Sequence, residues 1–216
     1  FGGDYYLQFL QNYLTNNWYQ GGESNYSMVV AATLIANYNN KQKVKWENKL
    51  EMKLGMQTTQ SDSIHNMRTS EDLIRYTGKL GLQATKRWYY TIQLLAQTQW
   101  TRHFRTNSRE VQSDFLSPLN ANLSIGMDYS VNWLKNQLTG TIHLAPLAYN
   151  FKYTDRLALS MQNGIPLGDH SLHDFGSQIT VDLNWKINNN MNWNTHLYGY
   201  TTYKRCEMAW ENTFTF

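Results

Sequence analysis

Residues 43–57 read KVKWENKLEMKLGMQ, and this stretch alternates between two kinds of side chain. Every second position from Val44 to Met56 is apolar or aromatic, apart from Asn48. The intervening positions from Lys43 to Lys53 all carry a charge. Successive side chains of a strand point to opposite faces, whereas a helix would mix the two sets around its circumference. The stretch is therefore predicted to be a strand with one apolar face and one charged face.

Several later segments repeat this alternation and are separated by polar links. Lys86-Arg87 and residues 188–190 are short enough to form tight hairpin turns. Residues 58–70, 103–113 and 162–173 are long and polar, as surface loops are. Short turns that alternate with long loops are typical of outer-membrane barrels. The apolar phase recurs in residues 74–84, 88–100, 121–133 and 179–187 and in the segments after Trp193.

These segments give about ten strands, with a further candidate at residues 5–14, in a single domain that spans residues 1–216. We predict an all-β fold, an antiparallel up-and-down transmembrane β-barrel of about 10–12 strands. The alternative is a soluble sandwich or lipocalin-like barrel. Soluble strands average roughly 5–6 residues, whereas several runs here keep their phase for about a dozen. No segment has the ~18 consecutive apolar residues that a membrane helix needs.

The aromatic residues also favour strands that span a membrane. Trp88 and Trp100 would lie about 40 Å apart along an extended strand, or roughly 28 Å across a tilted one. That matches an apolar band of about 25 Å with an aromatic ring at each interface. We expect six tryptophans at the membrane interfaces: Trp88, Trp100, Trp133, Trp185, Trp193 and Trp210. We expect the charged face to line the lumen: Lys43, Lys45, Glu47, Lys49, Glu51 and Lys53.

The composition argues against several other classes of protein. The 216 residues carry a formal net charge of +3 and the basic residues are scattered, so no nucleic-acid partner is expected. The single cysteine, Cys206, allows no internal disulfide and no cysteine-based metal cage. Residues Phe1 to Asp4 lack the basic and apolar regions of a signal peptide, so any such peptide is expected to have been removed.

Histidines and carboxylates are the residues that could carry chemistry. A catalytic arrangement requires these groups to meet within hydrogen-bond reach, which no spacing in the sequence establishes. A polar filling of the lumen is therefore favoured over a hydrolase for Asp128, His143, Asp182, His196, Glu207 and Glu211. A solvated loop is favoured over a metal site for Asp169, His170, His173 and Asp174. We predict no enzyme and assign no catalytic residue, no cofactor and no metal.

Six segments, in their order along the chain, resemble an uncharacterised family of Bacteroidetes outer-membrane barrels that is known as a domain of unknown function. They are residues 17–24 (NWYQGGES), 45–48 (KWEN), 69–74 (TSEDLI), 116–119 (LSPL), 202–204 (TYK) and 210–213 (WENT). The resemblance implies an outer-membrane barrel and no known activity. It also implies at least one hairpin after residues 210–213, so the chain is expected to lack a C-terminal hairpin.

The function expected from these observations is that of a non-enzymatic subunit or scaffold in the cell outer membrane of a Gram-negative bacterium. Its partners would be outer-membrane lipid and other outer-membrane or periplasmic proteins. A small channel or passive transporter is the alternative, and a hydrolase at the lumen or rim is a third hypothesis. Trp18, Gly21 and Gly22 could contact a partner, although a turn at the barrel rim is the favoured interpretation.

Overall fold

The computed structural model describes residues 1–14, 24–40, 43–58, 62–188 and 190–215. In this part of the chain no helix is long and apolar enough to cross a membrane. The strands are β1 (Gly2–Asn12), β2 (Asn25–Ile35), β3 (Tyr38–Asn40), β4 (Val44–Thr58), β5 (Arg68–Gln83), β6 (Trp88–Thr98), β7 (His103–Phe104), β8 (Val111–Ser113), β9 (Leu119–Trp133), β10 (Leu138–Tyr153), β11 (Ser171–Lys186), β12 (Asn192–Thr201) and β13 (Cys206–Thr215). Two short 3-10 helices are η1 (Leu134–Asn136) and η2 (Leu157–Leu159).

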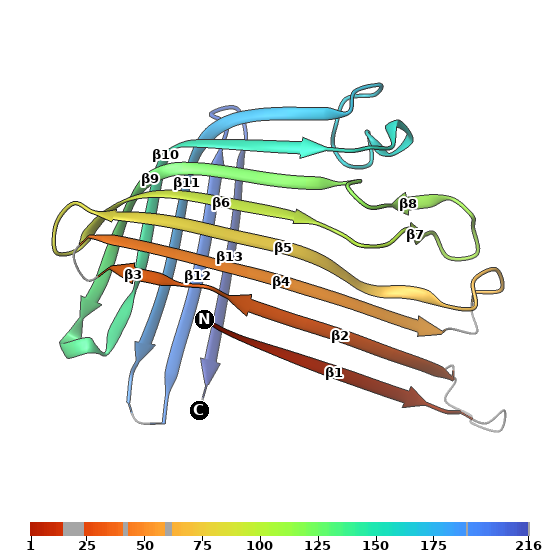
Figure 1. Cartoon of the computed structure of the whole chain (residues 1–216), viewed down its shortest axis with the longest axis horizontal. Coiled ribbons are helices and arrows are strands. Elements are labelled where there is room, and N and C mark those ends of the chain that lie inside the picture. Colours follow the sequence, from red (N-terminus) through yellow and green to blue (C-terminus); the bar gives the residue numbers. More distant parts are fainter. Residues whose placement is uncertain (15–23, 41–42, 59–61, 189, 216) are drawn as a thin grey trace.

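One antiparallel sheet of 11 strands contains all strands except β7 and β8, which form a separate hairpin. The order is β1-β2-β4-β5-β6-β9-β10-β11-β12-β13, with the short β3 paired to β4. Each long strand therefore lies beside the next long strand along the chain, which confirms the predicted all-β, up-and-down arrangement. Figure 1 shows the sheet curling: β9, β10 and β11 each bend along their length, and β12 and β13 run steeply across the direction of β1–β6.

The predicted closure into a barrel is not present in this structure. Strands β1 and β13 end the sheet, and no pairing among the described residues joins them. Both strands are exposed along their whole length, because each has a neighbour on one side only. The sheet is therefore a curved, open wall.

Irregular positions bend the central strands. The pairing of β10 shifts register against β9 between Leu144 and Leu147, a bulge that contains Pro146. Proline cannot donate to a ladder, and a bulge is one of the few places in a sheet that accepts it. At Gly126 on β9, a Cβ atom would lie 2.0 Å from the Leu144 carbonyl oxygen. Only glycine lets the two backbones approach so closely, and such kinks give a sheet its curvature.

At several positions in the central strands a polar side chain is buried and its apolar neighbour is exposed. Thr91 is 1% exposed, whereas its neighbour Ile92 is 46% exposed. Ser124 is fully buried, whereas Ile125 is 43% exposed. The buried phase faces the inside of the curve, since one pocket there joins residues of β4 and β10, which are not neighbours in the sheet. We call this side the inner face and the opposite, mainly apolar side the outer face.

Three regions differ from what the sequence alone indicated. Residues 103–113, expected to be a loop, contain the β7–β8 hairpin, in which His103 pairs with Ser113 and Phe104 with Val111. The expected loop at residues 162–173 ends in a strand, because β11 begins at Ser171 and includes His173 and Asp174. Residues 149–161 were not assigned to a strand from the sequence. There β10 continues to Tyr153, and η2 follows at Leu157–Leu159.

Candidate functional site

A chain of four polar side chains crosses the inner face near the middle of the sheet. His143 Nδ1 lies 2.5 Å from Asp128 Oδ1, and His143 Nε2 lies 3.2 Å from Ser124 Oγ. The Lys79 ammonium forms an ion pair with the other carboxylate oxygen of Asp128. The side chain of His143 is 3% exposed and that of Asp128 is 9% exposed. We call this set, Lys79–Asp128–His143–Ser124, the inner network.

Strand register brings these residues together. Asp128 on β9 pairs directly with His143 on β10, so their side chains leave the sheet on the same face. Ser124 lies four residues before Asp128 and therefore shares that face. Gly126 stands between them and adds no side chain there. Asp128 and His143 were among the six residues expected from the sequence to fill the lumen, whereas Ser124 and Lys79 were not expected to join them in one site.

The inner network has the connectivity of a serine–histidine–aspartate triad. Asp128 accepts from one ring nitrogen of His143, which leaves the other nitrogen to accept from the Ser124 hydroxyl. Such a serine could act as a nucleophile only where a substrate carbonyl can reach its oxygen. Ser124 is fully buried and does not line the adjoining pocket. In this conformation the network supplies hydrogen-bond partners for buried groups.

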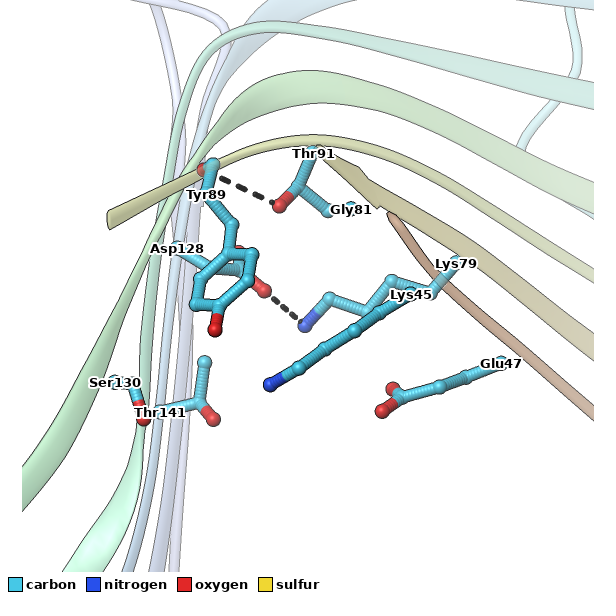
Figure 2. A pocket seen from close by; sticks show the side chains of 9 residues that line it. All are labelled: Lys45, Glu47, Lys79, Gly81, Tyr89, Thr91, Asp128, Ser130 and Thr141. Carbon is cyan, nitrogen blue, oxygen red and sulfur yellow. Dashed lines mark hydrogen bonds and ion pairs between the residues drawn. The ribbon is translucent and has the colours of Figure 1, made fainter. Parts of the chain in front are cut away.

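A small cavity of about 70 Å³ adjoins the inner network on the side of Lys79 and Asp128. Figure 2 shows the Lys45 and Glu47 side chains from β4 extending toward it, with Tyr89 and Asp128 opposite. The Lys45 ammonium lies 4.3 Å from the centre of the Tyr89 ring, within the range of a cation–π contact. The cavity therefore presents two ammonium groups, two carboxylates and several hydroxyls.

Three of the other residues predicted to line the lumen, Lys49, Glu51 and Lys53, take part in a ladder of charges on β4 and β5. Lys49 Nζ lies 2.8 Å from Glu51 Oε1, and Lys53 Nζ lies 3.1 Å from Glu71 Oε2. Lys43 lies in the turn before β4, where its carbonyl accepts from the Gln83 backbone N–H. Such pairs between exposed side chains contribute little to stability individually, but a network of them can brace a wall.

A second aspartate–histidine pair lies farther along the sheet. Asp182 Oδ1 and His196 Nδ1 are 2.5 Å apart on the directly paired strands β11 and β12. Glu211 pairs with His196 from β13 and lines the same open pocket. Both side chains of the pair are well exposed. Glu207 instead faces Arg205, with 3.7 Å between the charged atoms.

The tryptophans occupy different positions along the strands. At the ends joined by short turns, ring contacts link Trp88 to Tyr129, Tyr129 to Trp133, Trp185 to Trp193, and Trp193 to Phe214. Trp100 lies beyond the opposite end of β6, where its backbone N–H donates to Asp72. Trp210 lies within β13, and its indole N–H donates to the Thr195 hydroxyl. Trp18, Gly21 and Gly22 lie outside the described residues.

The long connections at the end opposite the short turns are tied together by polar contacts, and we call them the loop surface. Arg68 donates to Thr106, and the Ser63 backbone N–H donates to Asn107. The rings of His65 and Phe104 stack with centroids 5.0 Å apart. Farther along, the side-chain carboxylate of Asp114 binds both Arg102 and Arg156, at 2.9 and 2.6 Å.

Asp62 organises the first of these connections. Burial alone would raise the pKa of its carboxyl group. Hydrogen bonds from the His65 ring and from the backbone N–H groups of His65 and Ile64 outweigh that effect and lower the pKa to about 2. Because the pKa is lower in the folded state than the unfolded value of 3.8, the charged carboxylate stabilises the connection. This stabilisation is fully present above pH 3.8 and is lost as the pH falls through about 2.

We therefore expect the amide NMR signal of Ile64, which donates to Asp62, to show a transition below about pH 4 with a midpoint near 2. In Asp62→Asn this acid transition should be absent, because residue 62 then has no charge to lose. A midpoint near the ordinary value of a carboxyl group in the wild-type protein would contradict this assignment.

The remaining candidate residues are dispersed. His170 Nδ1 lies 2.8 Å from the Thr154 carbonyl oxygen, and Asp174 pairs with Arg205. Asp169 accepts from the Ser160 hydroxyl through its backbone carbonyl. Within the described ranges, no three side chains of His, Cys, Asp or Glu come together as metal ligands would. Cys206 is an exposed thiol at the start of β13.

A family model described as a protein of unknown function (DUF3078) matches residues 9–104, which extend from β1 to β7. The match agrees with the resemblance to an uncharacterised family that the sequence indicated. The description of the family gives no organism, no membrane location and no activity. No curated protein and no solved structure matches the chain.

Proposed function

We propose that the chain forms the wall of a transmembrane β-barrel in a cell outer membrane and acts as a non-enzymatic subunit or scaffold of a larger assembly. The inverted burial of the sheet supports the membrane part of this proposal. A soluble sheet buries its apolar face, whereas this one buries Thr91 and Ser124 and exposes Ile92 and Ile125. The hydrocarbon core of a lipid bilayer is the environment in which exposed apolar side chains of this kind are stable.

The loop surface supports the role as a subunit. Loops on a rigid scaffold are where recognition usually takes place. Here the loops are held in shape by contacts between distant segments, such as Ser63 with Asn107 and Asp114 with Arg156. The inner network supports a structural interior, because its serine is fully buried.

Removal of residues 105–110, the tip between β7 and β8, tests the subunit role. We expect the shortened protein to remain folded in the membrane, while its complex shrinks or disappears on native electrophoresis of detergent extracts. His196→Gln, which changes the inner face and leaves the loops intact, should preserve the complex. Loss of the complex in His196→Gln alone would favour an interior function instead.

A small channel is the second candidate, and the cavity lined by Lys45 and Glu47 is the observation that favours it. If the interior is mainly filled by side chains, the purified protein in planar bilayers should show no stable, large-conductance openings. Sustained conductance whose ion selectivity changes in the double variant Lys45→Gln, Glu47→Gln would make the channel the better function.

A further inference from the structure

The outer face carries a polar cluster on β10 and β11 that the proposed function does not use. His173 Nδ1 lies 2.6 Å from the Tyr149 hydroxyl oxygen, and Ser171 Oγ lies 3.2 Å from His173 Nε2. Ser171 and His173 share the outward phase of β11 with Phe175, which is 64% exposed. The cluster therefore lies on the same face as the exposed apolar side chains.

This cluster holds one more hydrogen-bond donor than it can use internally. Tyrosine, serine and neutral histidine each supply one proton, and the two contacts described consume two of them. Depending on the tautomer of His173, the remaining O–H proton belongs to Tyr149 or to Ser171. On an apolar face an O–H group without an acceptor is costly, so an external acceptor is needed there.

An apolar groove begins at the same residues. It has a volume of about 410 Å³ and is lined by Leu123, Ile125, Leu147, Tyr149, His173 and Phe175. The bulge at Pro146 lies next to Leu147, whose side chain is 50% exposed, and bulges re-aim side chains in this way. Tyr149 and His173 belong to both the groove and the cluster, so the two form one amphipathic site.

We propose that this site binds a glycerophospholipid, with an acyl chain in the groove and the ester carbonyl accepting from the Tyr149–His173–Ser171 cluster. The inference rests on the proposed membrane location. The lining favours the acyl ester of the lipid. The groove residues include no carboxylate, lysine or arginine, so no side chain there is suited to bind the phosphate group directly. An apolar slot that ends in a single spare donor matches a hydrocarbon chain that ends in a carbonyl acceptor.

Photolabelling tests the groove. The full chain is reconstituted in phospholipid nanodiscs that contain a glycerophospholipid with a diazirine on one acyl chain, and labelled peptides are mapped by mass spectrometry. We expect labelling of the groove residues to exceed that of other outward positions and to fall severalfold in Leu147→Trp, which fills the groove. Val30→Trp, an equally exposed outward position on β2, should leave groove labelling unchanged.

A competition between diester and diether phospholipids tests the polar end. The wild type should bind the diester phospholipid about threefold to tenfold more tightly than the diether phospholipid, as expected for one net hydrogen bond. The triple variant Tyr149→Phe, Ser171→Ala, His173→Phe should lose that preference and keep its groove labelling. Equal labelling of all outward positions, or no ester preference, would overturn the lipid site alone. Absence of label from every outward position, including the region of Val30, would instead overturn the membrane location.

Discussion

Replacement of Ile92 by arginine should lower the free energy of unfolding in a bilayer by about 2–4 kcal/mol, because it places a charge in the apolar band of the wall. Ile92 is 46% exposed and lies near the middle of β6. In a water-soluble protein, an exposed isoleucine at such a position could be exchanged for arginine with a change within roughly 0.5 kcal/mol. The size of the effect therefore distinguishes a lipid-facing surface from a water-facing one.

Reversible denaturant unfolding from liposomes measures this difference. Lys49→Gln provides the control, because Lys49 lies on the charged face and its side chain is already 46% exposed. It should change stability by less than about 1 kcal/mol, the usual limit for an exposed ion pair. If Ile92→Arg costs no more than Lys49→Gln, the outer face does not contact lipid.

The strands and their order could be predicted because the alternation of apolar and polar side chains can be recognised within each strand alone. The alternation around Val44–Thr58 separates two faces without reference to any other segment, and most long strands follow the same rule. Closure could not be judged in this way, since it depends on whether the edges of β1 and β13 find a partner. Local periodicity carries no information about such a distant pairing.

The candidate site was harder to predict because it depends on register. Ser124 and His143 are 19 positions apart, and only the pairing of Asp128 with His143 places them on one face at one level. A shift by one residue would turn His143 to the outer face. The cluster of Ser171, His173 and Tyr149 depends in the same way on the pairing of β10 with β11.

Asp128→Asn should destabilise the protein by about 3 kcal/mol, the second large effect that we expect. The substitution keeps the shape of the side chain and an oxygen that can accept from His143. It removes the carboxylate that forms the described ion pair with Lys79, whose side chain is 23% exposed. A largely buried charge that loses its partner costs about 3–5 kcal/mol, much of it because the remaining charge is left without compensation.

The double variant Asp128→Asn, Lys79→Met separates this explanation from a general disturbance of the inner face. Because both members of the Lys79–Asp128 ion pair are then neutral, most of the loss should be recovered, to within about 1 kcal/mol of the wild type, as measured by denaturant unfolding in liposomes. Ser124→Ala should cost only about 1 kcal/mol, the value of one hydrogen bond. The contrary result would be that Asp128→Asn and Ser124→Ala hardly change stability, while a fluorophosphonate labels Ser124 in the wild-type protein. That result would show that the serine is accessible and reactive, and the inner network would then have to be interpreted as catalytic.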